Sequence, residues 1–574
     1  MTLNQALSIC RNRTKGDTSS PYFLACGCQP LHLGTLLEAH LFQKLADDGI
    51  GVSTGHYGDL PGSLELASGS NCVGAFVLVE WSDLDPRLGL RSSGGWSPAS
   101  ITDILGTCAE RCARMADSLQ RLSGRMPVVV VPPGLPHAPI GTTISAQASQ
   151  VEMELESCLT GFLLRLSRLP GVRVLARSAL AAVGSSAPRL DAKMELLAGF
   201  PYTIPYADAL VEAAVGLMVQ QTPKKGLITD MDDTFWSGIV GEVGIDKVSW
   251  DQSSHTQAHG LYQQMLGHLA DMGVLLGVAS KNEQSVVESA LARPDLYLKA
   301  ESLFPVRANW GPKSKSVAEI LKIWNIDQTA AVFIDDSPME LSEVQAAFPG
   351  ITCIQFKGKD ANGVWELLGR LRDLFGKPQV GAEDLLRRAS IQAAEQIRDA
   401  GDSASSPEFL RGLAGCVTIE YAKDPSDRRS VELVNKTNQF NLNGLRIGEG
   451  EWLRMLEKPE TVLSVVSYTD KFGPLGKIAV AVGTRSEGTV NLSHWVMSCR
   501  AFSRRIEHHT LASLFETWDA EEIAFDFAPT AKNQPLQDFL SSLGLTGDDS
   551  GKYRISRAEF FARSGELPHS VSHP

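Results

Sequence analysis

The segment from Gly226 to Gly238 reads GLITDMDDTFWSG, an apolar run that leads directly into three aspartates and a threonine. The run predicts a short buried β-strand, and a D-x-D-x-T spacing begins at Asp230, where that strand should end. Ligands of open α/β sheets bind at the carboxyl ends of the strands. Negative charge concentrated there suits a bound cation or phosphoryl chemistry. Taken alone, the pattern also fits an ordinary acidic turn after a strand.

The first and third residues of this motif predict two different chemical roles. Asp230 can attack a phosphorus atom and form an aspartyl-phosphate. Asp232 can protonate the leaving oxygen and afterwards activate a water molecule. Thr234 is expected to position the loop and the phosphate by hydrogen bonding. The segment therefore predicts a phosphoryl-transfer site.

Three further segments that fit such a site follow in chain order. Residues 273–282, GVLLGVASKN, predict a second apolar strand that ends at Ser280, a hydroxyl suited to a phosphate oxygen. Residues 309–314, NWGPKS, supply Lys313, whose ammonium can pair with a carboxylate and a phosphate together. Residues 330–340, AAVFIDDSPME, predict a third strand that delivers paired acids. Each also has an ordinary interpretation, as a strand-end hydroxyl, a surface charge or a solvated turn, but all three would have to hold at once.

The acids of these segments form an all-oxygen set, which predicts Mg²⁺ rather than zinc. The expected metal ligands are Asp230, Asp232, Asp335 and Asp336. His255 and His259 lie four residues apart on a helix predicted over 254–272. Without acids or thiols at matching spacing, they are predicted to be surface histidines rather than metal ligands.

These motifs resemble the haloacid dehalogenase (HAD) superfamily of aspartate-nucleophile phosphatases. Their extended forms resemble its FkbH-like branch, subfamily IIIC: Trp236, Gly238, Gly241 and Glu242 after the first motif, ASKNE at 279–283 and FIDDSP at 333–338. The resemblance implies a glyceryltransferase/phosphatase that takes D-1,3-bisphosphoglycerate, a phosphorylated three-carbon acid. The glyceryl unit would pass to the phosphopantetheine arm of an acyl carrier protein, in polyketide or related natural-product biosynthesis. The implied catalytic residues are Asp230, Asp232, Thr234, Ser280, Lys313 and Cys499, and the implied substrate-binding residues are Trp236, Lys281 and Asn282.

The 574 residues are predicted to form an α/β chain of three domains. Residues 1–222 alternate apolar runs with helical patterns and resemble an SGNH-hydrolase fold, but no G-D-S motif follows their first strand. A structural or substrate-presenting role is therefore expected there. Residues 223–378 form the HAD-like Rossmann-type domain, in which the intervals between motifs leave no room for a cap. Residues 379–574 comprise a helical linker and an α+β domain that resembles an acyl-CoA N-acetyltransferase (GNAT) domain.

The C-terminal domain departs from the family pattern beside Cys499. The family reads C-R-V-L-G-R-G there, whereas residues 499–505 of this chain read CRAFSRR. Glycine lets the backbone approach a pyrophosphate, so the replacement of both glycines counts against CoA binding. Cys499 could hold a transient acyl thioester beside the arginines, or it could be a buried structural cysteine.

Composition limits the other possibilities. A net charge of -13 argues against nucleic-acid binding. The chain has no apolar run long enough for a membrane helix and no signal segment at its start, so a cytoplasmic protein with reduced cysteines is expected. Two alternatives to the glyceryltransferase/phosphatase stay open: a plain phosphomonoesterase acting on a small metabolite, and a non-enzymatic scaffold that docks carrier proteins.

Overall fold

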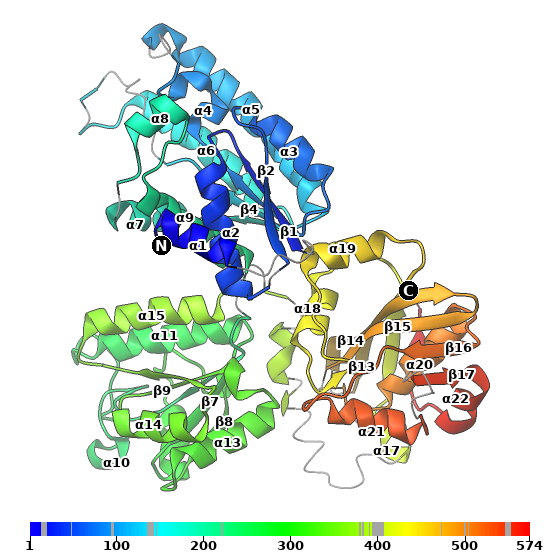
Figure 1. The fold of residues 1–574 in the computed structure, drawn as a ribbon. Helices are drawn as coiled ribbons and strands as arrows, with labels where there is room; N and C mark the ends of the chain where they lie inside the picture. Colours follow the sequence, from blue (N-terminus) through cyan, green and yellow to red (C-terminus); the bar gives the residue numbers. More distant parts are fainter. Residues whose placement is uncertain are drawn as a thin grey trace. The chain divides into compact units, whose positions relative to one another are not determined.

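The computed structural model describes most of the chain. The described residues are 1–12, 20–47, 49–92, 97–134, 143–144, 146–186, 188–219, 222–377, 380–381, 384–389, 391–392, 407–471, 473–498, 501–502, 504–545 and 553–573. The chain divides into two compact units, which are Met1–Gln221 with Lys423–Val431 and Arg446–Pro459, and Thr222–Ala422 with Glu432–Leu445 and Glu460–Pro574. Three sheets lie within these units, and each is described by itself (Figure 1).

The N-terminal sheet has five parallel strands in the order β2-β1-β3-β4-β5. The strands are β1 (Ser20–Cys26), β2 (Ile50–Thr54), β3 (Gly74–Leu78), β4 (Val128–Val131) and β5 (Val172–Val174). Alternate strand residues point to opposite faces. Helices α3 (Leu60–Ser68), α5 (Ile101–Ser123) and α6 (Gln150–Ser167) cover one face, and α2 (Leu31–Leu45) and α9 (Ile204–Met218) cover the other. The parallel α/β layer predicted for this region is confirmed.

The second sheet carries the motifs, and it too is parallel, in the order β10-β9-β6-β7-β8. Its strands are β6 (Gly226–Thr229), β7 (Leu275–Ser280), β8 (Leu303–Ala308), β9 (Ala331–Asp335) and β10 (Thr352–Gln355). β6 is central, with β7 on one side and β9 on the other. The chain reverses its direction of strand addition between β6 and β9, so their carboxyl ends flank the crevice where such sheets bind ligands.

Helices cover both faces of this sheet, which is why its strands are almost continuously apolar (Figure 1). Helices α11 (Gln257–Asp271) and α15 (Ala361–Phe375) pack on one face. Helices α13 (Lys313–Trp324) and α14 (Pro338–Ala347) pack on the other. Residues 222–377 are described without a gap, and only α10 (Val240–Val243) and α11 lie between β6 and β7, with α12 (Gln284–Leu291) and a short 3-10 turn between β7 and β8. No cap domain is inserted in either interval, as the motif spacing predicts.

The third sheet is mixed, with its strands in the order β17-β16-β15-β14-β13-β11-β18. They are β11 (Cys416–Glu420), β13 (Thr461–Asp470), β14 (Gly473–Ser486), β15 (Thr489–Met497), β16 (Glu522–Phe525), β17 (Tyr553–Ser556) and β18 (Ser570–Ser572), and the short β12 (Phe440–Asn441) pairs with β15. Helices α20 (Ile506–Thr517), α21 (Gln534–Ser542) and α22 (Arg557–Ser564) contribute to its core. β15 and β16 are parallel, whereas β13, β14 and β15 are antiparallel. Sheet and helices together give the α+β arrangement expected for this region.

The structure bears on two sequence-based expectations about helices. The helix predicted over 254–272 is observed as Gln257–Asp271, but His259 is buried rather than on the surface, with 5% of its area exposed. The predicted surface position is wrong for His259, because the helix turns this residue toward the sheet, whereas His255 is exposed as predicted. Among the described helices, none combines the length and the apolar character that crossing a membrane requires.

Trp324 provides a test of the packing beneath the site. Its ring lies against the backbone of β6 and β7, where a Cβ on Gly226 would come within 2.5 Å and one on Gly277 within 2.8 Å. Its Nε1 donates to the carbonyl oxygen of Phe304 at 2.8 Å. We expect Trp324→Ala to lower the free energy of unfolding by about 3–5 kcal/mol, because it opens a cavity under the central strands. Urea denaturation followed by circular dichroism would measure the change.

Trp365→Ala is the matched control, since Trp365 lies on α15 and is 69% exposed. This control should change the free energy of unfolding by no more than about 0.5 kcal/mol. Equal effects of the two substitutions would contradict the packing argument.

Candidate active site

Asp230 is the first residue after β6. Its backbone N–H donates to the carbonyl oxygen of Ile334 at 2.9 Å, so the hydrogen bonding between β6 and β9 continues up to this residue. The side chain is almost completely buried. The pairing of β6 with β9 and the burial of the side chain therefore fix the position of this carboxylate.

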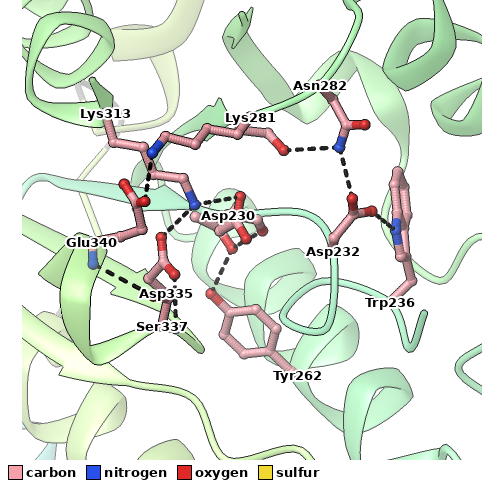
Figure 2. Close-up of polar contacts among 12 residues, drawn as sticks. Asp230, Asp232, Trp236, Tyr262, Lys281, Asn282, Lys313, Asp335, Ser337 and Glu340 are labelled. Atoms are coloured by element: carbon pink, nitrogen blue, oxygen red, sulfur yellow. Dashed lines mark hydrogen bonds and ion pairs between the residues drawn. The ribbon is translucent and has the colours of Figure 1, made fainter. Parts of the chain in front are cut away.

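Lys313 joins the ends of β6 and β9 (Figure 2). It is the first residue of α13 and is buried, and its Nζ lies 2.8 Å from Asp230 Oδ1 and 2.6 Å from Asp335 Oδ2. Burial alone would lower the pKa of the ammonium, but the two carboxylates outweigh burial and raise it. A buried ammonium needs such partners, because leaving a buried charge unpaired costs several kcal/mol.

Asp230, Asp335 and Asp336 form an acidic group in which one oxygen of each lies within 4.8 Å of the others. Burial raises the pKa of Asp230 to about 6, against the opposing effect of Lys313. Burial likewise raises the pKa of both Asp335 and Asp336. Three carboxylates face a single ammonium, so their ionised state carries excess negative charge. An all-oxygen set of this kind fits a hard divalent cation such as Mg²⁺, which would offset that charge.

Asp232 is not one of the three acids of this group, and its expected role as a metal ligand stays a prediction. Its Oδ1 accepts hydrogen bonds from Trp236 Nε1 at 2.8 Å and from the backbone N–H of Val240 at 3.0 Å. Its Oδ2 accepts one from Asn282 Nδ2 at 2.8 Å. Local turn geometry directs this carboxylate toward β7, and the motif spacing alone could not reveal that direction (Figure 2).

Asn282 connects the first and second motifs. Its Nδ2 donates to Asp232 and, at 3.3 Å, to the hydroxyl oxygen of Ser280, the last residue of β7. Both Asn282 and Ser280 are buried. Ser280 and Asp232 thus share Asn282 as a donor, and the role of Ser280 as a phosphate-binding hydroxyl stays a prediction.

The other expected substrate-binding residues lie differently. Trp236 is completely buried, so its indole N–H orients Asp232 and its ring is part of the core. Lys281 Nζ pairs with Glu340 Oε1 at 2.6 Å, and its side chain is 38% exposed. Lys281 therefore lies at the exposed edge of the site. Trp236 lies in the core and supports the site through its hydrogen bond to Asp232.

Thr234 is buried, and its Oγ1 has no hydrogen-bond partner among the described residues. Its carbonyl oxygen accepts from His259 Nδ1 at 3.0 Å. A carbonyl oxygen can only accept, so Nδ1 of His259 carries the hydrogen in this contact, and burial lowers the pKa of the ring. A buried hydroxyl without a partner is costly, and a phosphate oxygen would satisfy it.

Three polar residues of α11 support the loop: His259, which was predicted to be at the surface, and Tyr262 and Gln263, which were not predicted to have a role. Their spacing of i, i+3 and i+4 places them on one helix face, which was a signal available in the sequence. Cys499 and its neighbours Arg500 and Ser503 lie outside the described residues. The expected acyl relay at Cys499 therefore stays a prediction.

The fold of this chain is similar to a solved structure of the N-terminal part of the protein BF1531 from Bacteroides fragilis, described as containing a phosphatase domain complexed with Mg. The alignment has a TM-score of 0.50 and 18% sequence identity, and covers 66% of this chain and 100% of that chain. A second solved structure aligns with a TM-score of only 0.21 and 16% identity, which carries no argument. Comparisons with protein-family models and with curated proteins found no match. Fold and site together define a Rossmann-like α/β protein with a lysine-bridged acidic centre.

The raised pKa of Asp230 predicts a pH-dependent cost in stability. Burial favours the protonated carboxyl in the folded protein, so ionisation costs folding free energy as the pH rises from the ordinary value of 3.8 to about 6, and the cost persists above that range. In chelator at pH 7.5 we expect Asp230→Asn to melt at a higher temperature than the wild type. The difference should shrink as the pH falls toward about 4. Calorimetry across this range would measure it.

Asp271→Asn is the matched control, because Asp271 is exposed at the end of α11. This variant should follow the wild type at every pH. Adding Mg²⁺ should stabilise the wild type more than Asp230→Asn, since a ligand that binds only the folded state raises its stability. Identical melting of wild type and Asp230→Asn at pH 7.5 would contradict the electrostatic argument.

Proposed function

We propose that residues 223–377 form a Mg²⁺-dependent phosphatase of the HAD type, with Asp230 as its nucleophile. The observation that carries this proposal is the buried Lys313, whose ammonium joins Asp230 to Asp335 at the switch point of the parallel sheet. Phosphoryl transfer depends almost entirely on positioning and on charge stabilisation, and this arrangement supplies both. The similarly folded structure described as a phosphatase domain complexed with Mg supports the same conclusion.

The residues divide the reaction into two steps. In the first, a carboxylate oxygen of Asp230 forms a bond to phosphorus while the bond from phosphorus to the leaving oxygen breaks, and Asp232 gives its proton to that oxygen. In the second, Asp232 takes a proton from water, the water oxygen attacks phosphorus, and the carboxylate of Asp230 leaves. Inorganic phosphate is the product. Lys313 offsets negative charge throughout.

Mg²⁺ would be held by Asp230, Asp335 and Asp336, and when bound it supplies charge neutralisation at the phosphoryl oxygens. Ser280 and the unpartnered hydroxyl of Thr234 would hold phosphate oxygens. Asn282 and Trp236 would keep the carboxylate of Asp232 in one orientation during the reaction.

The substrate we propose is a phosphorylated three-carbon acid such as D-1,3-bisphosphoglycerate, with an acyl carrier protein as acceptor. The resemblance of the motifs to the FkbH-like branch supports this choice. The C1 acyl-phosphate is already activated toward a thiol, so acyl transfer needs mainly positioning. The C3 phosphomonoester is not activated and requires the catalytic groups. The absence of a cap within 222–377 leaves the site open, which suits a substrate attached to a macromolecule.

The flanking regions would serve this reaction as an SGNH-like domain and a GNAT-like domain. The order of strands in the N-terminal sheet and the antiparallel-to-parallel change at β15 and β16 support these proposals. Cys499 would be either an acyl relay or a structural residue. A plain phosphomonoesterase is the second candidate, because the catalytic groups account for phosphate removal without any acyl transfer.

The first functional prediction concerns the nucleophile and the metal. Asp230→Asn should lower the rate of phosphate release from a phosphomonoester by at least about a thousandfold, because the amide has the same shape but is a poor nucleophile. Excess chelator should abolish the wild-type activity, and Mg²⁺ should restore it. Initial rates would be measured beside melting curves, with Asp271→Asn as the control that keeps wild-type activity. Turnover of Asp230→Asn within tenfold of wild type, or full activity in chelator, would reject the assignment.

The second functional prediction concerns the molecule that accepts the glyceryl group. With D-1,3-bisphosphoglycerate and Mg²⁺, a pantetheinylated carrier protein should gain a glyceryl-sized mass, and its unmodified apo form should gain none, because only the former offers the thiol. Intact-mass spectrometry over a panel of carrier proteins would record the change. Phosphate release with no labelling of any carrier would favour the plain phosphomonoesterase. Equal labelling of the apo form would defeat the acceptor claim.

A further inference from the structure

One face of α11 packs against the loop from Asp230 to Phe235, called the catalytic loop below, and this face carries polar side chains. His259, Tyr262 and Gln263 lie on it, and each is buried, with 5%, 0% and 0% of its area exposed. Residues spaced i, i+3 and i+4 share one helix face, which in a helix that covers a sheet is normally apolar. Buried polar groups are kept only where they are hydrogen-bonded. The partners of these three side chains therefore indicate why the helix has them.

Two of the side chains bind consecutive carbonyl groups of the catalytic loop. His259 Nδ1 donates to the carbonyl oxygen of Thr234 at 3.0 Å. Gln263 Nε2 donates to that of Phe235, also at 3.0 Å, and its Oε1 accepts from the backbone N–H of Tyr297 at 3.2 Å. The loop from Asp230 to Phe235 is thus held at its far end by two donors from one helix.

The third side chain reaches the near end of the same loop. The Tyr262 hydroxyl donates to Thr229 Oγ1 at 3.0 Å, and Thr229 Oγ1 donates to the carbonyl oxygen of Asp230 at 2.8 Å (Figure 2). These two bonds form a relay from α11 to the backbone of the nucleophile. His259 and Gln263 therefore contact main-chain atoms directly, and Tyr262 acts on a main-chain atom through Thr229. Together they hold both ends of the segment that contains Asp230 and Asp232.

The loop needs this support because its own geometry is strained. Asp233, between Asp232 and Thr234, has a φ of 50°, a left-handed conformation that is unfavourable for a non-glycine residue. A buried carbonyl left without a hydrogen-bond partner would destabilise the loop further. The donors of α11 pair with these carbonyl groups. They also hold the loop, so that Asp233 keeps its left-handed conformation.

We propose that His259, Tyr262 and Gln263 are positioning residues that set the distance and direction between Asp230 and Asp232 for phosphoryl transfer. They touch no substrate. They fix the backbone from which the nucleophile and the acid extend, so the rate of the chemical step depends on them while the binding of substrate does not. This inference rests on the proposed phosphatase function of the same site.

The test compares variants of the full chain with p-nitrophenyl phosphate and Mg²⁺ as the probe. His259→Leu removes the donor to Thr234. His259→Asn keeps one, because the amide Nδ2 of asparagine is attached to Cγ as Nδ1 of histidine is. We expect His259→Leu to lower kcat by about ten- to a hundredfold with KM within twofold, since small misplacements of reacting groups have effects of this size. His259→Asn should recover kcat to within about threefold of the wild type.

Two further variants complete the design. His268→Leu is the matched control, because His268 is exposed on the same helix, and it should keep wild-type kcat and KM. Tyr262→Phe removes a single oxygen and breaks the relay to Asp230, so it should lower kcat severalfold without a change in KM. This variant keeps the proposal testable if His259→Leu fails to fold.

The outcomes separate the two proposals. Wild-type kcat in folded His259→Leu, or in Tyr262→Phe, would overturn the positioning role, and so would equal loss in His259→Leu and His259→Asn. If Asp230→Asn retains activity, the phosphatase assignment itself fails. If Asp230→Asn is inactive while the α11 variants are fully active, the phosphatase stands and only the positioning inference is lost.

Discussion

The contact of Lys313 with Asp230 and Asp335 is the interaction on which the rest of the site depends. A lysine with 5% of its side chain exposed is stable only because two carboxylates lie 2.8 and 2.6 Å away. Those carboxylates repel one another and are kept together by the same ammonium. The three groups therefore fix each other, and they fix the ends of β6 and β9 with the start of α13.

The strand order makes this interaction available. β6 and β9 are neighbours although about a hundred residues separate them, because the chain adds strands first on one side of β6 and then on the other. Carboxyl ends of parallel strands meet at one edge, so acids that are distant in sequence converge there. The excess of carboxylates over ammonium groups leaves a negative site, and a divalent cation is the simplest way to offset that charge.

A second set of contacts holds the loop rather than the charges. The carboxylate of Asp232 accepts hydrogen bonds from Trp236, Val240 and Asn282. Asp230 and Asp232, the two acids of one motif, therefore have different partners. One lies in the charged group and the other in a hydrogen-bonded cradle. Two carboxylates in different surroundings can take different roles, as nucleophile and as general acid. Residues of α11 hold the backbone between them.

The sequence by itself determined three strands of the central sheet, β6, β7 and β9, the acids and hydroxyl at their carboxyl ends, and the absence of a cap. Hydrophobic runs and motif spacing are local properties, and a residue that ends a buried parallel strand must lie at the ligand edge. Asp230, Ser280 and Asp335 were therefore placed correctly from their positions in the chain.

Only the tertiary structure decided where each side chain points. Asp232 turns away from the acidic group, Trp236 lies in the core, and His259 faces the loop instead of solvent. Each of these directions depends on partners from other strands and helices, up to 50 residues away in the case of Asp232 and Asn282. Spacing can place polar residues on one helix face, but it does not identify their partners, because burial and hydrogen bonding are set by the packing of the whole sheet and its helices.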